Sequence, residues 1–470
     1  MNDWVDAEDH VERAHEHYEA GRWDEAESEL RHALALNPYQ PEWHFNLGLT
    51  LEAAGRHKDA ADAFRVCHEL RDDDAQSALA VGMNLVRDGR AADALFWIER
   101  AEKLDPNSVT PLVHKIDALT ELGEHEQAEV AFFMGQQIDQ NNAELYAAMA
   151  ESLLERRDFD RAIWCLREAS RLDPELLRIN ARLAQAYAET GRQERARQLY
   201  QRELRQDPGD IETLLDLGDL LVDMNRLDEA SEKYRRVLEI EPDHPDAHFA
   251  LGEVAIRHGR SADACVAFDI VIRLDPDHPD ARRQLADLLL SSGSADDVRR
   301  ARELLQTELR AQSRSPKPDP SSLEELGHLL LDADLPREAS RVFERLLELR
   351  PNDHKALHHM SVAMLEMGQL ESGIDSAKAA LRLNPRFVPA MHNLALAHLR
   401  RGEWLRARYW ARQGRVIDPD DASMRRLCVI LRIHSVGLIA RWMGRACLRG
   451  AIIVKGLVTR PARPQTRHLG

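Results

Sequence analysis

The chain has 470 residues, of which 44% are hydrophobic and 31% are charged, and its formal net charge at pH 7 is −18. Because nucleic acids carry a dense negative charge, an acidic body disfavours their binding, and we expect no nucleic-acid partner. The sequence holds no phosphate-binding loop, nucleophile elbow or dinucleotide fingerprint, so we expect no enzymatic activity.

Two markers return every 34 residues from the N-terminus onward. A glycine recurs at Gly21, Gly55, Gly89, Gly123, Gly191, Gly259 and Gly293. An alanine recurs in a second register, at Ala26, Ala60, Ala94, Ala128, Ala162, Ala196, Ala230 and Ala264. A period of this size is typical of helical repeats that stack into a solenoid.

Each repeat predicts two short helices joined by a tight turn. In residues 75–108, apolar and small side chains three and four apart stand on both sides of Gly89. Glycine supplies the positive φ that ends the first helix, and the alanine lets the second helix lie close against the first. A large apolar residue then fills the space between the helices, at Leu30, Phe64, Ile98, Phe132, Leu166, Tyr200, Tyr234 and Phe268.

The order of glycine, alanine and large apolar residue, followed in most units by proline, resembles the tetratricopeptide repeat family. The resemblance covers nine units in residues 7–310 and three more in residues 323–421. It implies an all-α fold, an α-solenoid of about twelve helix-turn-helix units in a superhelix. Arg157 and Asn225 stand where the turn glycine is expected, and Ala301 rather than Val298 fits the alanine place of the ninth unit.

Two segments lie outside the repeats. Residues 311–322 hold Pro316, Pro318 and Pro320 among serines and a lysine, which predicts a surface loop or hinge between a long and a short arm of the solenoid. After the last unit, residues 422–434 carry apolar side chains suited to a helix that caps the open core of the final repeat.

The C-terminal segment differs from the body in charge. Residues 422–470 contain ten Lys and Arg and no Asp or Glu, whereas the first 421 residues carry 53 basic and 81 acidic groups. Residues 435–470 predict a basic amphipathic tail, which suits an anionic membrane surface. The other interpretations are that the tail packs on the solenoid or folds back into its groove. The candidate membrane or partner contacts are Arg441, Trp442, Arg445, Arg449 and Lys455.

The resemblance also implies that the first helix of each unit lines an inner, concave face. Carboxylates recur on this helix, in three units as pairs four residues apart, where like charges cost a little helix stability. Because this cost in helix stability recurs, the pattern favours a function for the carboxylates, namely an acidic groove that binds a basic peptide. The alternative is that they form the solvated face of an acidic protein. The candidate groove residues are Asp117, Glu121, Glu151, Glu155, Glu189, Asp219, Asp223, Glu253 and Asp287.

The remaining chemistry-bearing residues predict no site. Five cysteines lie far apart with no paired spacing, which indicates free thiols and a reducing compartment. The acidic N-terminal segment lacks a signal-peptide pattern, and no uncharged apolar run is long enough to span a bilayer, so the expected location is the cytoplasm. His354 and His358 have helical spacing without a third ligand, so we expect no metal and no cofactor.

These features predict a non-enzymatic scaffold or adaptor that binds partner proteins or basic peptides along an acidic concave groove. One alternative is a peripheral membrane organiser that the basic tail anchors. Another is an adaptor that its own tail inhibits.

Overall fold

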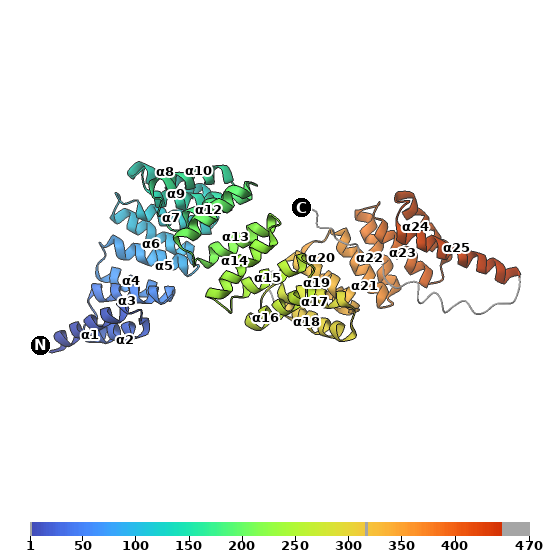
Figure 1. The fold of residues 1–470 in the computed structure, drawn as a ribbon, viewed down its shortest axis with the longest axis horizontal. Helices are drawn as coiled ribbons and strands as arrows, with labels where there is room; N and C mark the ends of the chain where they lie inside the picture. The colour runs from blue at the N-terminus through green and yellow to red at the C-terminus, as the bar shows by residue number, and fades with distance from the viewer. Residues whose placement is uncertain (1, 315–317, 444–470) are drawn as a thin grey trace. The chain divides into compact units, whose positions relative to one another are not determined.

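The computed structural model describes the backbone of residues 2–314 and 318–443, and the side chains of residues 6–314 and 318–432. These residues form 25 α-helices and no strand (Figure 1). The chain divides into two compact units, and the boundary between them in the sequence falls between Pro242 and Asp243.

The first unit contains seven helix pairs. Its helices are α1 (Asn2–Glu19), α2 (Trp23–Leu36), α3 (Pro41–Ala53), α4 (His57–Leu70), α5 (Ala75–Arg87), α6 (Ala91–Leu104), α7 (Thr110–Glu121), α8 (His125–Ile138), α9 (Ala143–Glu155), α10 (Phe159–Leu172), α11 (Ile179–Glu189), α12 (Gln193–Gln206), α13 (Ile211–Asp223) and α14 (Leu227–Ile240).

The second unit contains five further pairs and a final helix. Its helices are α15 (Pro245–Arg257), α16 (Ser261–Leu274), α17 (Ala281–Ser292), α18 (Ala295–Arg314), α19 (Pro320–Asp332), α20 (Pro336–Leu349), α21 (His354–Glu366), α22 (Leu370–Leu383), α23 (Val388–Arg400), α24 (Trp404–Ile417) and α25 (Ala422–Met443).

Every one of the twelve pairs turns through one residue in the left-handed backbone region. Nine of these residues are glycines with φ between 70° and 75°. The other three are Arg157, Asn225 and Asp334, with φ of 60°, 58° and 59°. The turn conformation predicted from the repeated glycines is therefore kept where another residue replaces glycine. The packing of the two helices holds the turn in this conformation.

The repeated alanines and the large apolar residues form the core of each pair. The eight alanines from Ala26 to Ala264 are 0% exposed, as is Ala301, and the eight large residues from Leu30 to Phe268 are at most 5% exposed. In five pairs the large side chain lies on a glycine of the first helix. A Cβ atom at these glycines would lie less than 3.0 Å from it: Gly48 on Phe64, Gly82 on Ile98, Gly218 on Tyr234, Gly252 on Phe268 and Gly327 on Phe343.

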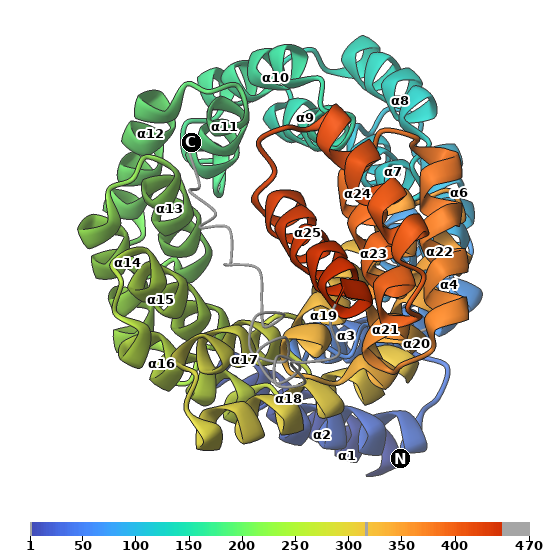
Figure 2. The same ribbon diagram turned by 90° about the vertical axis from the view of Figure 1, so that its right-hand side faces the viewer.

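The two helices of a pair lie at different depths within the first unit. Helices α7, α9, α11 and α13 line the inner side of this unit's curve, and α8, α10, α12 and α14 lie outside them (Figure 2). Successive inner helices also contact each other, as α7 contacts α9 and α11 contacts α13. Side chains from several repeats therefore come together on the inner side.

Helix α25 covers the last pair. Met424, Leu427 and Leu431 are at most 6% exposed and pack with Ala407 and Ala411 of α24. The helix continues to Met443, and the capping interpretation of residues 422–434 stays a prediction. None of the helices described is both long enough and apolar enough to cross a membrane.

Ion pairs of two buried arginines connect the helices of the ninth pair with each other and with the tenth pair. Arg282 Nε donates to Glu308 Oε2 at 2.9 Å, and both side chains are at most 8% exposed. Arg283 of α17 donates through Nε to Glu325 of α19 at 3.0 Å. Buried charges are stable only when each is paired, so these contacts fix α17, α18 and α19 against one another.

Apolar packing also continues across this part of the chain. Leu305 of α18 and Leu323 of α19 belong to one core cluster and are 0% and 1% exposed. Helix α18 extends to Arg314, and α19 begins at Pro320. The hinge expected in residues 311–322, and the division into arms of nine and three units, stay predictions.

We expect Gly48→Ala to lower the free energy of unfolding by about 1–3 kcal/mol, because its Cβ would lie 2.6 Å from the Phe64 ring and force the helices apart. The control is Gly209→Ala, whose Cβ would meet only ordinary contacts at 3.5 Å, and whose effect should stay within about 0.5 kcal/mol. Thermal unfolding followed by circular dichroism measures both. Equal destabilisation by the two variants would contradict this account of the packing.

Candidate functional site

Four predicted groove residues come together on the inner side of the first unit. Asp117 and Glu121 lie on α7, Glu151 and Glu155 lie on α9, and these helices pack directly on each other. Burial raises the pKa of Glu121, and the charges of Asp117 and Glu155 raise it further. Burial likewise raises the pKa of Glu151, with Asp117 and Glu155 adding to the effect. We call these four residues the acidic cluster.

Two arginines from the next repeat border the acidic cluster. Arg182 of α11 lies with its Nε 2.9 Å from Glu151 Oε1, and its positive charge opposes the rise in the pKa of Glu151. Arg178 precedes α11 in the left-handed region, with φ of 58°, and is ion-paired with Glu212. The face is therefore not uniformly acidic: a basic pair separates the acidic cluster from the carboxylates of α13.

The remaining predicted groove residues of the first unit lie apart from the acidic cluster. Asp219 of α13 accepts a hydrogen bond from the Tyr234 hydroxyl at 2.6 Å. Glu189 of α11 lies 3.5 Å from the Arg157 guanidinium, and Asp223 is exposed at the end of α13. Asp219 and Glu189 are thus engaged with residues of the chain itself.

Some predicted residues fall elsewhere. Glu253 and Asp287 are exposed on α15 and α17 of the second unit. The side chains of Arg441 and Trp442 are outside the described residues. Arg445, Arg449 and Lys455 also lie outside the described part of the chain.

The sequence reasoning missed Arg182 and Asp216 on the inner face. Each is the sixth residue of its repeat, so the two are 34 residues apart. Asn46 and Asn393 occupy the same position in their own repeats. Burial raises the pKa of Asp216, which Arg178 opposes and Asp219 reinforces. The groove prediction considered the ninth and thirteenth places of each unit, whereas both of these residues stand at the sixth place.

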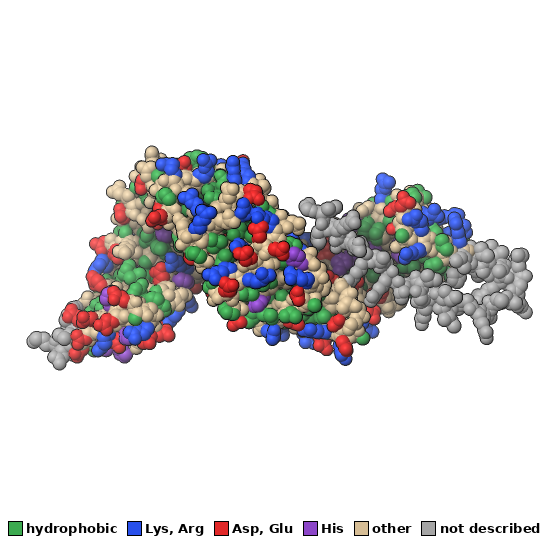
Figure 3. Space-filling view, viewed as in Figure 1, with side chains coloured by type: hydrophobic (Ala, Val, Ile, Leu, Met, Phe, Trp, Pro, Cys, Tyr) green, Lys and Arg blue, Asp and Glu red, His purple; other side chains and the backbone are tan. Residues whose placement is uncertain are grey.

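A separate feature lies on the outer helices of the first unit. Phe96, Val130 and Trp164 occupy the same place of α6, α8 and α10 and are 65%, 59% and 53% exposed. Phe133 and Met134 of α8 are exposed as well. Hydrophobic side chains are visible at the surface among charged ones in Figure 3. Exposed apolar side chains in such a row are typical of a protein-contact surface.

Three odd-numbered helices of the second unit carry imidazoles. His328 on α19, His358 and His359 on α21 and His392 on α23, together with His354, form what we call the histidine cluster. The ring centroids of His328 and His359 are 4.0 Å apart, and those of His358 and His359 are 4.9 Å apart. Burial lowers the pKa of His358 to about 4, and the neighbouring histidines add to this effect. Burial also lowers the pKa values of His328, His359 and His392.

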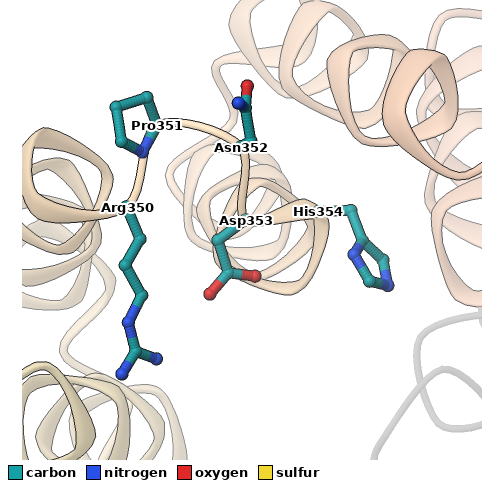
Figure 4. Close-up of a pocket in the computed structure, with 5 residues that line it drawn as sticks. All are labelled: Arg350, Pro351, Asn352, Asp353 and His354. Atoms are coloured by element: carbon teal, nitrogen blue, oxygen red, sulfur yellow. The ribbon is translucent and has the colours of Figure 1, made fainter.

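A hollow of about 410 Å³ lies at the α20–α21 connection, lined by residues 350–354 (Figure 4). Arg350 and Asp353 extend to one side of this connection, and His354 points away from them. The Asp353 carboxylate accepts hydrogen bonds from the Lys355 and Ala356 amides at 2.8 and 3.1 Å. This carboxylate therefore caps α21, and the hollow is a turn with a structural role.

Comparison with known proteins agrees with the repeat pattern. A tetratricopeptide repeat family model matches residues 11–75, 147–211 and 362–422, and a model of the middle TPR-like domain of cilia and flagella-associated protein 70 matches residues 181–316. Curated protein sequences give no match.

Several solved structures resemble the chain. PilF of Pseudomonas aeruginosa is 19% identical with a TM-score of 0.40, over 46% of this chain and 99% of that one. The TPR protein TTC0263 of Thermus thermophilus is 20% identical with a TM-score of 0.37, over 39% of this chain and 100% of that one. Yeast Tom70 is 16% identical with a TM-score of 0.36, over 97% of this chain and 99% of that one.

Twelve helix pairs, each turning through a left-handed residue and packing on its neighbours, define a helical-repeat solenoid. With the matching family models, the chain is a tetratricopeptide repeat protein. This fold is generally a non-catalytic scaffold for protein–protein interaction.

The histidine cluster makes the second unit sensitive to acid. The unfolded chain binds protons at these histidines near pH 6.5, whereas folded His358 resists protonation until about pH 4. Its contribution to stability is therefore complete above pH 6.5 and is lost as the pH falls toward 4, by roughly 3 kcal/mol for His358 alone.

Thermal unfolding at several pH values between 6.5 and 4 measures how stability falls with acid. This fall should be shallower in a variant carrying His358→Gln and His359→Gln than in wild type. The exposed-histidine variant His15→Gln is the control and should keep the wild-type slope. An identical pH slope in the double variant and wild type would show that the cluster does not control acid stability.

Removing charge from the acidic cluster should stabilise the fold. Because like charges repel across α7 and α9, we expect Glu121→Gln with Glu155→Gln to raise the free energy of unfolding at pH 7 by roughly a few tenths of a kcal/mol. The raised pKa of Glu121 gives the sign: this group costs stability as the pH rises through its folded pKa.

The matched control for this double variant is Glu232→Gln with Glu303→Gln, on outer helices, and denaturant unfolding measures both. Only the variant with Glu121→Gln and Glu155→Gln is expected to gain stability. A loss of stability in the inner pair would contradict the repulsion argument.

Proposed function

We propose that this protein is a scaffold that binds a basic segment of a partner protein on the inner face of its first unit. The observation that carries the proposal is the acidic cluster. Its four carboxylates come from two adjacent inner helices, and the charges of Asp117 and Glu155 help to raise the pKa values of Glu121 and Glu151. Such an arrangement costs folding energy that a cationic ligand would recover.

The cluster has unused capacity for a cation. Among the described residues, Arg182 pairs with Glu151, whereas Glu121 and Glu155 are exposed and make no ion pair. A lysine or arginine side chain from a partner can therefore reach two carboxylates without displacing an internal cation. Arg178 and Arg182 border the cluster on the α11 side, so the bound segment would carry its positive charge over α7 and α9 and less of it over α11.

Charge would contribute mainly to the rate of association and to specificity, because exposed ion pairs are weak and screened by salt. The curved inner face supplies the contact area. The membrane-organiser and tail-inhibited alternatives rest on residues 435–470 and on sequence alone.

The test uses the full chain and a fluorescent lysine- and arginine-rich peptide, followed by anisotropy at two salt concentrations. A variant with all four carboxylates neutralised should bind at least about tenfold more weakly at low salt and lose most of its salt dependence. Its substitutions are Asp117→Asn, Glu121→Gln, Glu151→Gln and Glu155→Gln.

The control removes the same charge from outer helices and should bind like wild type. Its substitutions are Asp160→Asn, Glu232→Gln, Glu239→Gln and Glu303→Gln. Equal weakening by the two variants would mean that the peptide senses only net charge, and that the acidic cluster is a solvated face.

A further inference from the structure

A different group of polar side chains lies on the first helix pair. His10 of α1, with Glu29 and His32 of α2, offers three donor atoms that lie within 4.8 Å of one another. His10 Nδ1 is 2.6 Å from Glu29 Oε2, and the rings of His10 and His32 stack with centroids 5.3 Å apart. The side chains of His10 and Glu29 are 25% and 23% exposed, and His32 is exposed. An ion from solvent can therefore reach the group.

Apolar packing between α1 and α2 holds these donors together. Glu29 and His32 are three residues apart and so share one side of α2. Buried apolar residues of both helices lie near the group in sequence: Ala7 with Ala33, and Ala14 with Leu30. This apolar packing holds α1 against α2. The three polar side chains therefore meet without contributing to the contact between the helices.

The donor set selects a chemical class of ion. Two imidazole nitrogens and one carboxylate oxygen suit zinc and its neighbours among the divalent transition metals, with water in a fourth position. Calcium and magnesium prefer sites made of oxygen donors.

We propose that His10, Glu29 and His32 form a binding site for a zinc-class divalent cation. This site is independent of the acidic cluster. The sequence did not reveal it because the ligands come from two helices, and His10 and Glu29 are 19 positions apart in the chain.

Arg13 competes with the ion for the same carboxylate. Its Nε donates to Glu29 Oε2 at 3.0 Å, and its Nη2 lies 2.7 Å from His10 Nδ1. The Arg13 side chain is half-exposed, at 50%, so it can swing into solvent when a cation arrives. Arg13 therefore sets the affinity of the site, and its removal should strengthen binding. A merely adventitious surface contact predicts no such gain.

Calorimetric titration of the full chain with zinc chloride tests the proposal. We expect His10→Ala, Glu29→Gln and His32→Ala each to weaken the tightest binding step at least about tenfold, since loss of even an outer partner of a metal ligand costs that much. Arg13→Ala should tighten the same step. The control is His15→Ala, because His15 and Glu19 are 70% exposed, 3.3 Å apart and form only a two-donor pair.

Circular dichroism confirms that each variant keeps its helices. His32 is exposed, so His32→Ala tests the site with little risk to the core. The proposal is overturned if all three ligand variants bind zinc as wild type does. It is also overturned if wild type and Arg13→Ala both fail to bind zinc.

Discussion

The contact on which the structure depends is the close approach of the two helices in each pair. A fully buried alanine in eleven pairs, Gly373 at the same place in the other pair and, in five pairs, a glycine beneath a large apolar side chain allow it. Dense packing leaves no room for another methyl group at these glycines. The left-handed turn follows from this approach, because Arg157, Asn225 and Asp334 adopt it without being glycine.

Repetition of this contact decides where polar chemistry can occur. Most buried places of the repeats are apolar or small, so most charged side chains are left to the inner and outer surfaces, with Arg282 and Glu308 among the exceptions. In the first unit the inner surface gathers Asp117, Glu121, Glu151 and Glu155, and in the second unit three odd-numbered helices gather histidines. The two groups respond oppositely to acid: protonation relieves repulsion among the carboxylates, whereas it introduces charge among partly buried imidazoles.

Much of the fold could be predicted from sequence because a repeat records the same physical requirement many times. The alanine register, the large apolar residues and the turn positions all occupy the places expected of them. Of the proposed groove residues, the structure brings four together and pairs Asp219 with Tyr234 and Glu189 with Arg157. Arg182 was not predicted because the groove residues were chosen as acidic side chains, and Arg182 carries the opposite charge.

The sequence by itself determined the helix pairs, their turns and their buried places, since these depend on neighbours within one 34-residue unit. Only the tertiary structure decided which polar groups meet. Glu151 and Arg182 belong to successive repeats, and His10 and Glu29 to successive helices, so their separation depends on how the helices stack. Burial then shifts the pKa values of Glu151 and His358, and burial depends on neighbours that no single repeat contains.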